Sequence, residues 1–224
     1  MLNRMWTAGL LLCTPAALNA QTLAEVCSAV GQLDSGSYVT YELDGASPTG
    51  QQISEMRFAL VGQEAGGSEA GFWYEFRAMA EEMIIVQMLV PGFPFDPADI
   101  RALVLKSGEQ PAMKIPSEML GLVRSQIEQN EMAEFGKQCA ESEVLGTETV
   151  SVPAGEFYTL HIRTKMGTGE AWISQDIPFG MVKARTDTGE EMVLTGYGYD
   201  AVSSIDETPV EMPLPGLSGA GAAN

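Results

Sequence analysis

The chemistry that this sequence can support is limited first by its histidine content. His161 is the only histidine, and it lies on a predicted strand, on the face that also carries Thr159 and Arg163. Zinc sites need several ligands at defined spacings, and no HExxH, CxxC or paired-histidine pattern occurs. Asp96 and Asp99 do not belong to a calcium-binding loop pattern. We therefore predict no metal site and interpret His161 as an ordinary strand histidine.

Motifs for a nucleophile or a cofactor are equally weak. The segment Gly216–Gly219 resembles part of a nucleophile elbow but lacks the strand and helix that would strain one. Gly196 and Gly198 lack the third glycine and the following helix of a dinucleotide-binding loop. Glu75 and Glu170 could project into a cleft, although solvation at the surface explains both carboxylates more simply. We therefore predict no catalytic residue, no cofactor and a non-enzymatic function.

The apolar side chains suggest a different kind of site. The chain contains 13 methionines, and methionine suits surfaces that accept irregular apolar ligands. A large curved sheet with few helices to cover it could use such residues to line a lipid-binding concavity. A core that is simply filled with methionine is the alternative. The candidate ligand-binding residues, all apolar and all on predicted strands, are Phe58, Phe76, Met88, Leu160, Ile162 and Trp172.

Strand and turn patterns dominate the elements that must position these residues. Apolar and polar residues alternate from Tyr38 onward in several runs separated by glycine-rich turns, and Met83–Val90 is apolar on both faces. Pro153–Gly155 predicts a hairpin turn. After it, Tyr158, Leu160 and Ile162 share one face, which we expect to point toward the core.

Two short helical segments interrupt this pattern. One begins near Thr22 and places Cys27 on its buried stripe, and the other begins at Ser117 and breaks near Asn130 before a piece that carries Cys139. The fold class expected is therefore α+β but mainly β, with one large curved antiparallel sheet and short helices packed on it.

The N-terminus indicates export. Residues 1–20 combine a positive n-region, an apolar run and a small-residue cleavage site, which is typical of a signal peptide. Cys13 follows Leu12 inside the apolar run, so lipid attachment there is the less favoured interpretation. The mature chain retains Cys27 and Cys139, and in an oxidising compartment we predict a disulfide between them. Two buried thiols that never meet are the alternative. The predicted location is the periplasm.

Charge excludes one large class of function. The 12 basic side chains are outnumbered by 30 acidic ones, which gives a formal net charge of −18. Nucleic acid and anionic head groups require basic patches, and the sequence contains no run of Lys and Arg. An acidic surface is expected to keep the protein soluble and monomeric, although it also suits a dedicated basic partner.

From residue 209 onward Pro, Gly and Ala dominate, which predicts a disordered tail over residues 209–224.

Three motifs carry a resemblance to a known group of proteins: the Gly146–Gly155 strand and turn, Trp172–Ser174, and Ile177–Lys183. In these motifs the chain resembles uncharacterised periplasmic proteins related to the LolA/LolB lipoprotein-carrier superfamily. The resemblance implies a half-open β-barrel over a single domain at residues 21–208, with helices that plug its concave side. It also implies binding of a lipid or another hydrophobic ligand. A structural or interaction module of the cell envelope, with a filled core and an acidic partner-binding surface, is the alternative.

Overall fold

The structure is a computed structural model that describes residues 23–30, 32–44, 53–65, 70–128, 139, 141–164 and 169–213. The predicted signal peptide at residues 1–20 and the predicted helix break near Asn130 lie outside these ranges.

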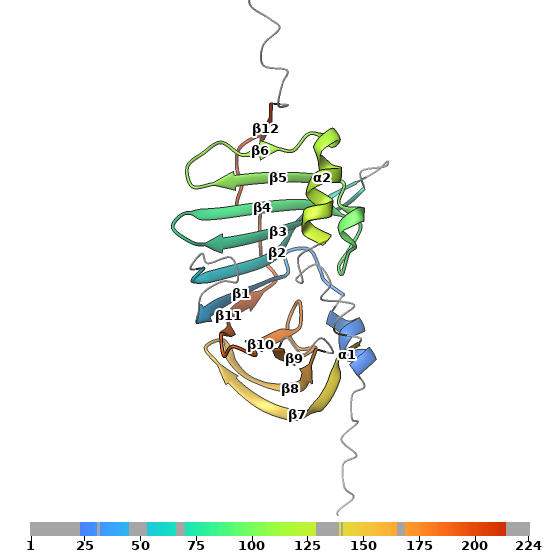
Figure 1. Ribbon diagram of the computed structural model, residues 1–224, viewed down its shortest axis with the longest axis vertical. Helices are drawn as coiled ribbons and strands as arrows, with labels where there is room; N and C mark the ends of the chain where they lie inside the picture. Colours follow the sequence, from blue (N-terminus) through green and yellow to red (C-terminus); the bar gives the residue numbers. More distant parts are fainter. Residues whose placement is uncertain are drawn as a thin grey trace, which may run out of the picture.

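One twelve-stranded sheet organises the chain, with the strand order β12-β6-β5-β4-β3-β2-β1-β11-β10-β9-β8-β7 (Figure 1). Every neighbouring pair is antiparallel except β12 and β6, which are parallel. The strands are β1 (Tyr38–Asp44), β2 (Glu55–Glu64), β3 (Gly71–Met79), β4 (Met83–Val90), β5 (Ala102–Ser107), β6 (Met113–Lys114), β7 (Glu143–Val152), β8 (Gly155–Arg163), β9 (Gly169–Ile173), β10 (Met181–Thr186), β11 (Glu191–Gly198) and β12 (Val210–Glu211). The predicted mainly-β α+β fold with one large sheet is confirmed. The sheet is open, with β12 and β7 at its two ends.

The α-helices α1 (Leu23–Val30) and α2 (Ser117–Glu128) lie in the described part of the chain, and Cys139 and Glu141 are helical as well. The helix α2 packs Leu120 against the sheet. It is also tied to the connection that precedes β5, because the Arg124 Nε donates to the carbonyl of Ile100 at 2.9 Å. A short 3₁₀ helix, η2 (Pro97–Asp99), precedes β5, and its first turn is capped by the Asp96 carboxylate.

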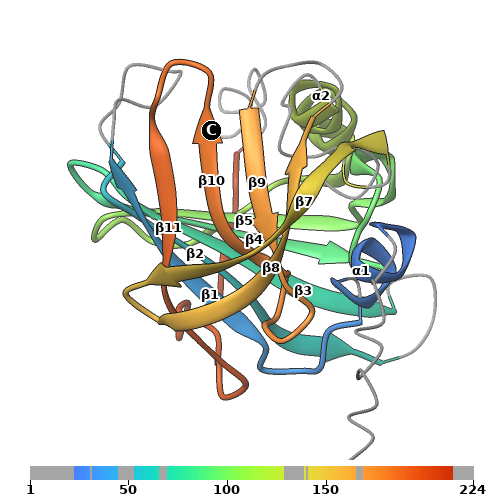
Figure 2. The same cartoon turned by 90° about the horizontal axis from the view of Figure 1, so that it is seen from below.

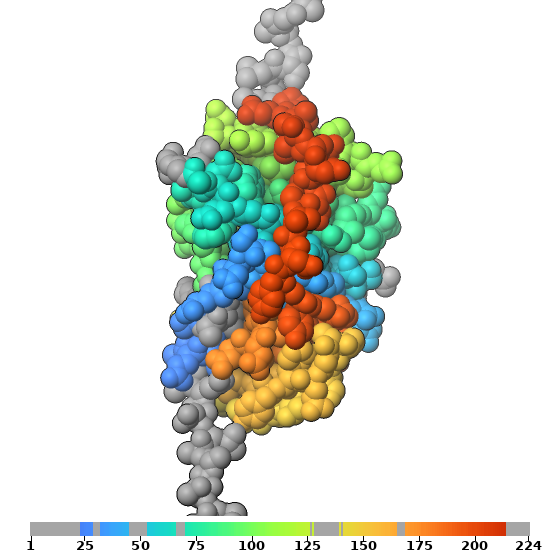
Figure 3. Space-filling model, turned by 180° about the vertical axis from the view of Figure 1, so that it is seen from behind, coloured from blue at the N-terminus to red at the C-terminus, as the bar shows by residue number. Residues whose placement is uncertain are grey.

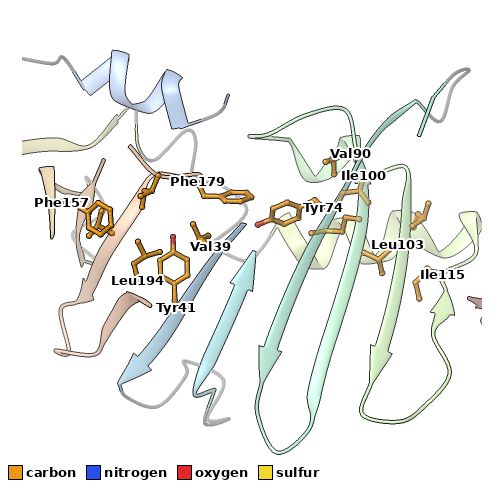
Figure 4. Close-up of a cluster of buried hydrophobic side chains, with 14 residues drawn as sticks. Val39, Tyr41, Tyr74, Val90, Ile100, Leu103, Ile115, Phe157, Phe179 and Leu194 are labelled. Atoms are coloured by element: carbon orange, nitrogen blue, oxygen red, sulfur yellow. The ribbon is translucent and has the colours of Figure 1, made fainter. Parts of the chain in front are cut away.

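The sheet has two faces that differ in what covers them. The face that α2 covers, here called the helix face, carries the main core, in which Val39, Tyr41 and Leu194 are almost completely buried (Figure 4). The opposite face carries Glu75 and Gln87 and is called the strap face, because the C-terminal segment crosses it. Strand alternation separates the two faces, since successive side chains point to opposite sides.

The C-terminal strap, residues 199–212, crosses the strap face from β1 to β6 (Figure 3). It starts beside Gly36, whose carbonyl accepts from Ala201 N at 2.9 Å. Gly36 has φ +87, and a Cβ there would lie 2.3 Å from the Tyr199 carbonyl oxygen, so only glycine allows this approach. Val210 and Glu211, predicted to belong to a disordered tail, form β12 instead, and residues 214–224 lie outside the described ranges.

A buried carboxylate anchors the middle of the strap. Glu75 is 1% exposed and accepts from Gln87 Nε2 at 2.8 Å, from Ser204 N at 2.8 Å and from Ser204 Oγ at 2.7 Å. Arg57 lies 3.8 Å from the same carboxylate. The interpretation of Glu75 as a solvated surface residue is therefore wrong, because the strap covers the polar side of β3.

The β7–β8 hairpin arches over the ends of β10 and β11 (Figure 2). Its tip is tied down by Ala154 N, which donates to the Leu194 carbonyl at 3.2 Å. Leu160 and Ile162 are buried as predicted, but Tyr158 is 56% exposed. The alternation holds only for the second half of the strand, because Phe157 and Thr159, on the face opposite Leu160, are buried as well and Phe157 belongs to the main core. Pairing with β9 covers only residues 160–163, so Tyr158 lies beyond this neighbour.

The predicted disulfide between Cys27 and Cys139 is present, and it joins residues 112 positions apart in the sequence. Cys139 is buried beside Val26 in a second apolar cluster, which α1 forms with Leu160 and Ile162. The disulfide therefore ties the N-terminal helix to the segment that leads into β7.

Replacing both cysteines by serine should lower the free energy of unfolding by about 4–5 kcal/mol, because the unfolded chain gains the freedom of a loop of this length. Urea unfolding of the oxidised wild type and of the Cys27→Ser/Cys139→Ser variant measures the difference. The wild type treated with a reductant is the matched control and should approach the variant. Superimposable curves for the oxidised wild type and the variant would contradict this assignment.

Ser204→Ala should loosen the strap, because it removes one of the hydrogen bonds to the buried Glu75 carboxylate. The expected cost is about 1–3 kcal/mol. Hydrogen exchange should become faster at the amides of residues 200–207, and urea unfolding should show the lower stability. Ser151→Ala, at an exposed position on β7, is the control. Unchanged exchange in the strap would show that Ser204 does not hold it.

Candidate functional site

The structure brings five of the six candidate ligand-binding residues to one face. Cross-strand pairing places Phe58 beside Phe76 on the helix face, and Met88 lies beside Tyr74 on the same face. The pairing continues through β11, β10 and β9 to Ile162 and Leu160. Trp172 does not join them, because it pairs with His161 and therefore points to the opposite face.

The helix face is covered in large part by the protein's own aromatic rings, of which Tyr41, Tyr74 and Phe179 are buried and the others half-buried. The ring of Phe58 lies 5.2 Å from Phe76, 6.0 Å from Tyr41 and 6.4 Å from Phe179, measured between centroids. Tyr74 lies 5.9 Å from Phe93 and 5.6 Å from Phe95. We call these seven residues the aromatic cluster: Tyr41, Phe58, Tyr74, Phe76, Phe93, Phe95 and Phe179.

Three rings of the aromatic cluster come from connecting segments instead of strands. Phe93 and Phe95 belong to the connection between β4 and η2, and Phe179 belongs to the connection between β9 and β10. Phe179 has φ +58, an uncommon backbone conformation for a bulky residue, and its side chain is 5% exposed. Tyr41 lies beneath these rings and donates to the Met181 carbonyl at 2.8 Å, and burial raises the pKa of its phenol. The two connections therefore cover part of the area predicted to hold an apolar ligand.

An open hollow of about 490 Å³ lies elsewhere, at the turns that join β3 to β4 and β5 to β6. Glu82, Met83 and Gly108–Gln110 line it. None of the six candidate residues contributes to this lining, so the hollow is unrelated to the predicted lipid site.

A polar cluster surrounds His161 on the face opposite the aromatic cluster. The imidazole stacks on the Trp172 indole, with centroids 4.3 Å apart and planes 15° apart. Its Nδ1 lies 3.2 Å from Glu148 and its Nε2 lies 3.2 Å from Glu170. The indole Nε1 of Trp172 donates to Glu148 at 2.6 Å, and Lys183 lies over the indole ring. These contacts join β7, β8, β9 and β10.

Glu170 is the hub of this polar cluster. Its carboxylate accepts from Arg163 Nη2 at 2.6 Å and from Arg185 Nη2 at 2.7 Å. These two hydrogen bonds, together with the contact to His161, lower the pKa of Glu170 to about 2. The carboxylate is 15% exposed, so the interpretation as a solvated surface group is wrong for Glu170 as well.

The arrangement around His161 is a structural clamp. A general base needs a ring nitrogen free to reach a substrate, whereas both nitrogens of His161 face carboxylates of the protein. Among the described residues, no group of three His, Cys, Asp or Glu side chains is placed to hold a metal ion. Sequence reasoning found His161 but missed Glu148 and Arg185. Period-two alternation places Glu148 and Arg185 each on one face of its own strand. Only the pairing of the strands shows that both side chains lie close to His161.

No protein-family model and no curated protein matches this chain. Two solved structures show a distant similarity. One is a "putative lipoprotein" of Parabacteroides distasonis, with 11% identity, 75% of this chain and 98% of that chain covered, and a TM-score of 0.34. The other is a "putative exported protein with YmcC-like fold" of Bacteroides fragilis, with 12% identity, the same coverages and a TM-score of 0.33. At scores of this size the similarity is too loose to indicate a function.

A helix that spans a membrane must be long and apolar. Within the described ranges, no helix is long and apolar enough to cross a bilayer.

Glu170→Gln should destabilise the protein at neutral pH by about 1–2 kcal/mol, because the charged hydrogen bonds of two arginines are weakened. The folded-state pKa of about 2 lies below the ordinary value of 4.5, so this contribution is present above pH 4.5 and is lost as the pH falls toward 2. Urea unfolding of both proteins at pH 7, 4 and 2.5 measures it. The two stabilities should converge as the pH falls.

Glu81→Gln is the control, because Glu81 is an exposed carboxylate outside the cluster. A difference between wild type and Glu170→Gln that stays constant from pH 7 to pH 2.5 would contradict the role of the ionised carboxylate.

Proposed function

We propose that this protein is an exported, non-enzymatic interaction module of the cell envelope, which binds a cationic partner on its acidic surface. The observation that carries the proposal is the cover that the chain's own rings and helices place over much of the helix face. Met88, Leu160 and Ile162 belong to buried clusters, while the half-buried Phe58 packs against the main core and contacts the half-buried Phe76, so much of this apolar surface contributes to the core. A binding protein of this kind presents its outer surface to its partner.

Two further properties support the proposal. The Cys27–Cys139 disulfide suits an oxidising compartment such as the periplasm, where such bonds persist. The net charge of −18 favours a soluble monomer and attracts partners of opposite charge, for which complementarity increases the rate and the specificity of association.

A second candidate function is binding of a lipid or another apolar ligand. It is favoured by the origin of the aromatic cover, because Phe93, Phe95 and Phe179 lie on connections that could move without breaking the sheet. An acyl chain would then replace these rings against Phe58 and Phe76. The resemblance to the LolA/LolB-like proteins, and the half-open barrel that it implies, would fit this second candidate function.

Native mass spectrometry of the protein purified from a periplasmic extract, followed by organic extraction, separates the two candidates. We expect the mass of the polypeptide alone and no binding of added palmitate or phospholipid. A reproducible bound lipid that is lost in Phe58→Glu but kept in Tyr158→Glu, with both variants folded by circular dichroism, would favour the second candidate. Tyr158 is the matched control because it is an exposed aromatic residue.

Cross-linking in the periplasm followed by mass spectrometry tests the leading candidate directly. We expect cross-links to one or a few proteins of basic character that are lost at high salt, because screening weakens the attraction between opposite charges. An absence of salt-sensitive partners together with an absence of lipid would contradict the proposed function.

A further inference from the structure

We propose that the free edge of β7 binds an extended cationic segment of the partner, which adds to the sheet as one more strand. This inference rests on the proposed function, and it names the surface and the chemistry of the partner.

The first argument is the backbone of β7. This strand is ten residues long and lies at the end of the sheet, where β8 is its only paired neighbour among the described strands. All seven residues from Glu143 to Thr149 are exposed, so solvent reaches the strand along most of its length. An edge strand of this kind presents N–H and C=O groups that can pair with another chain. The other end of the sheet differs, because the short β12 of the strap covers β6.

The second argument is charge. Exposed carboxylates gather along the hairpin at Glu141, Glu143, Glu148 and Glu156, and β7 contains no Lys or Arg. Arg163 lies opposite Glu143 in the register but is hydrogen-bonded to Glu170, and Glu148 already contacts His161 and Trp172, so Glu143 shares one cation with Glu170 while Glu141 and Glu156 add to the negative charge. A strand that brings Lys or Arg to this edge would find opposite charges, whereas a second copy of β7 would bring more carboxylates to the same place. Charge therefore favours a cationic segment over self-pairing.

The third argument is the apolar part of the same edge. A bulge between Val144 and Gly146 leaves the side chains of Val144 and Leu145 at 46% and 38% exposure. Thr147 and Thr149 follow, and both favour an extended partner by their β-branched shape. A segment in which cationic residues alternate with apolar or threonine residues would match this surface.

The fourth argument is preorganisation. The tip of the hairpin is tied to β11 through Ala154, and its middle is tied to β8 and β9 through Glu148, which accepts from Trp172. A strand that is already held in its extended form loses little conformational entropy when a partner pairs with it. The polar clamp around His161 would thus serve binding by holding the edge in place.

The test uses a ten-residue peptide, acetylated and amidated, in which Lys alternates with Thr and Val. It is titrated into the full mature chain labelled with ¹⁵N. We expect amide shift changes concentrated at residues 143–151. Glu143→Lys should weaken binding about twofold to fivefold, which is the range for loss of an exposed charge pair. Glu109→Lys, at an exposed position at the other end of the sheet, should leave the affinity unchanged.

The same peptide with four consecutive central residues N-methylated has the same charge but cannot form the ladder, so we expect its binding to be lost. Equal binding of both peptides would overturn strand addition. Shift changes at Glu82 and Glu109 instead of β7, or no binding of either peptide, would overturn the β7 assignment. Those outcomes would not decide the proposed function, which the cross-linking experiment tests separately. Dimerisation through β7 in sedimentation would overturn the choice of partner.

Discussion

Coverage of the apolar helix face is the constraint on which the rest of this structure depends. A sheet with an apolar face must bury it against another layer, and twelve strands offer far more area than two short helices can cover. The chain meets this requirement with its connections. Phe93 and Phe95 fold back over Tyr74, Phe179 fills the space beside Phe58, and α1 covers Leu160 and Ile162. The same segments that could have bordered a ligand cavity therefore pack against the core, and Phe179 is part of it.

The opposite face is covered by different means at its two ends. Over β2 to β5 the strap lies on the sheet, and this explains why β4 is apolar on both sides: Ile85 packs against Ile205 of the strap while Met88 points into the main core. Over β8 to β10 no such segment is needed, because Glu170 and its two arginines pair with each other. Burial of Glu75 under the strap requires full hydrogen bonding, which Ser204 and Gln87 supply.

Local structure could be predicted from the sequence, and long-range placement could not. Alternation and the Pro153–Gly155 turn predicted the β7–β8 hairpin, because both act between near neighbours. The face of Trp172 was not predictable from its own strand, since Ala171, Trp172 and Ile173 are all apolar and give no period-two signal. Glu75 appeared solvated for a related reason. The strap that buries this carboxylate has no apolar period, so nothing in its sequence indicated that it crosses β3.

The distribution of charge connects the core to the outer surface. Cations are few, and most of those in the described ranges serve internal contacts: Arg57, Arg77, Lys106, Arg124, Arg163, Lys183 and Arg185 contact partners within the chain. Each of these cations cancels one negative charge, and the excess of acidic side chains leaves a net charge of −18. A surface of this kind repels copies of itself and attracts cationic chains. An edge strand that would otherwise invite self-pairing is therefore compatible with solubility, because its carboxylates discriminate between the two kinds of partner.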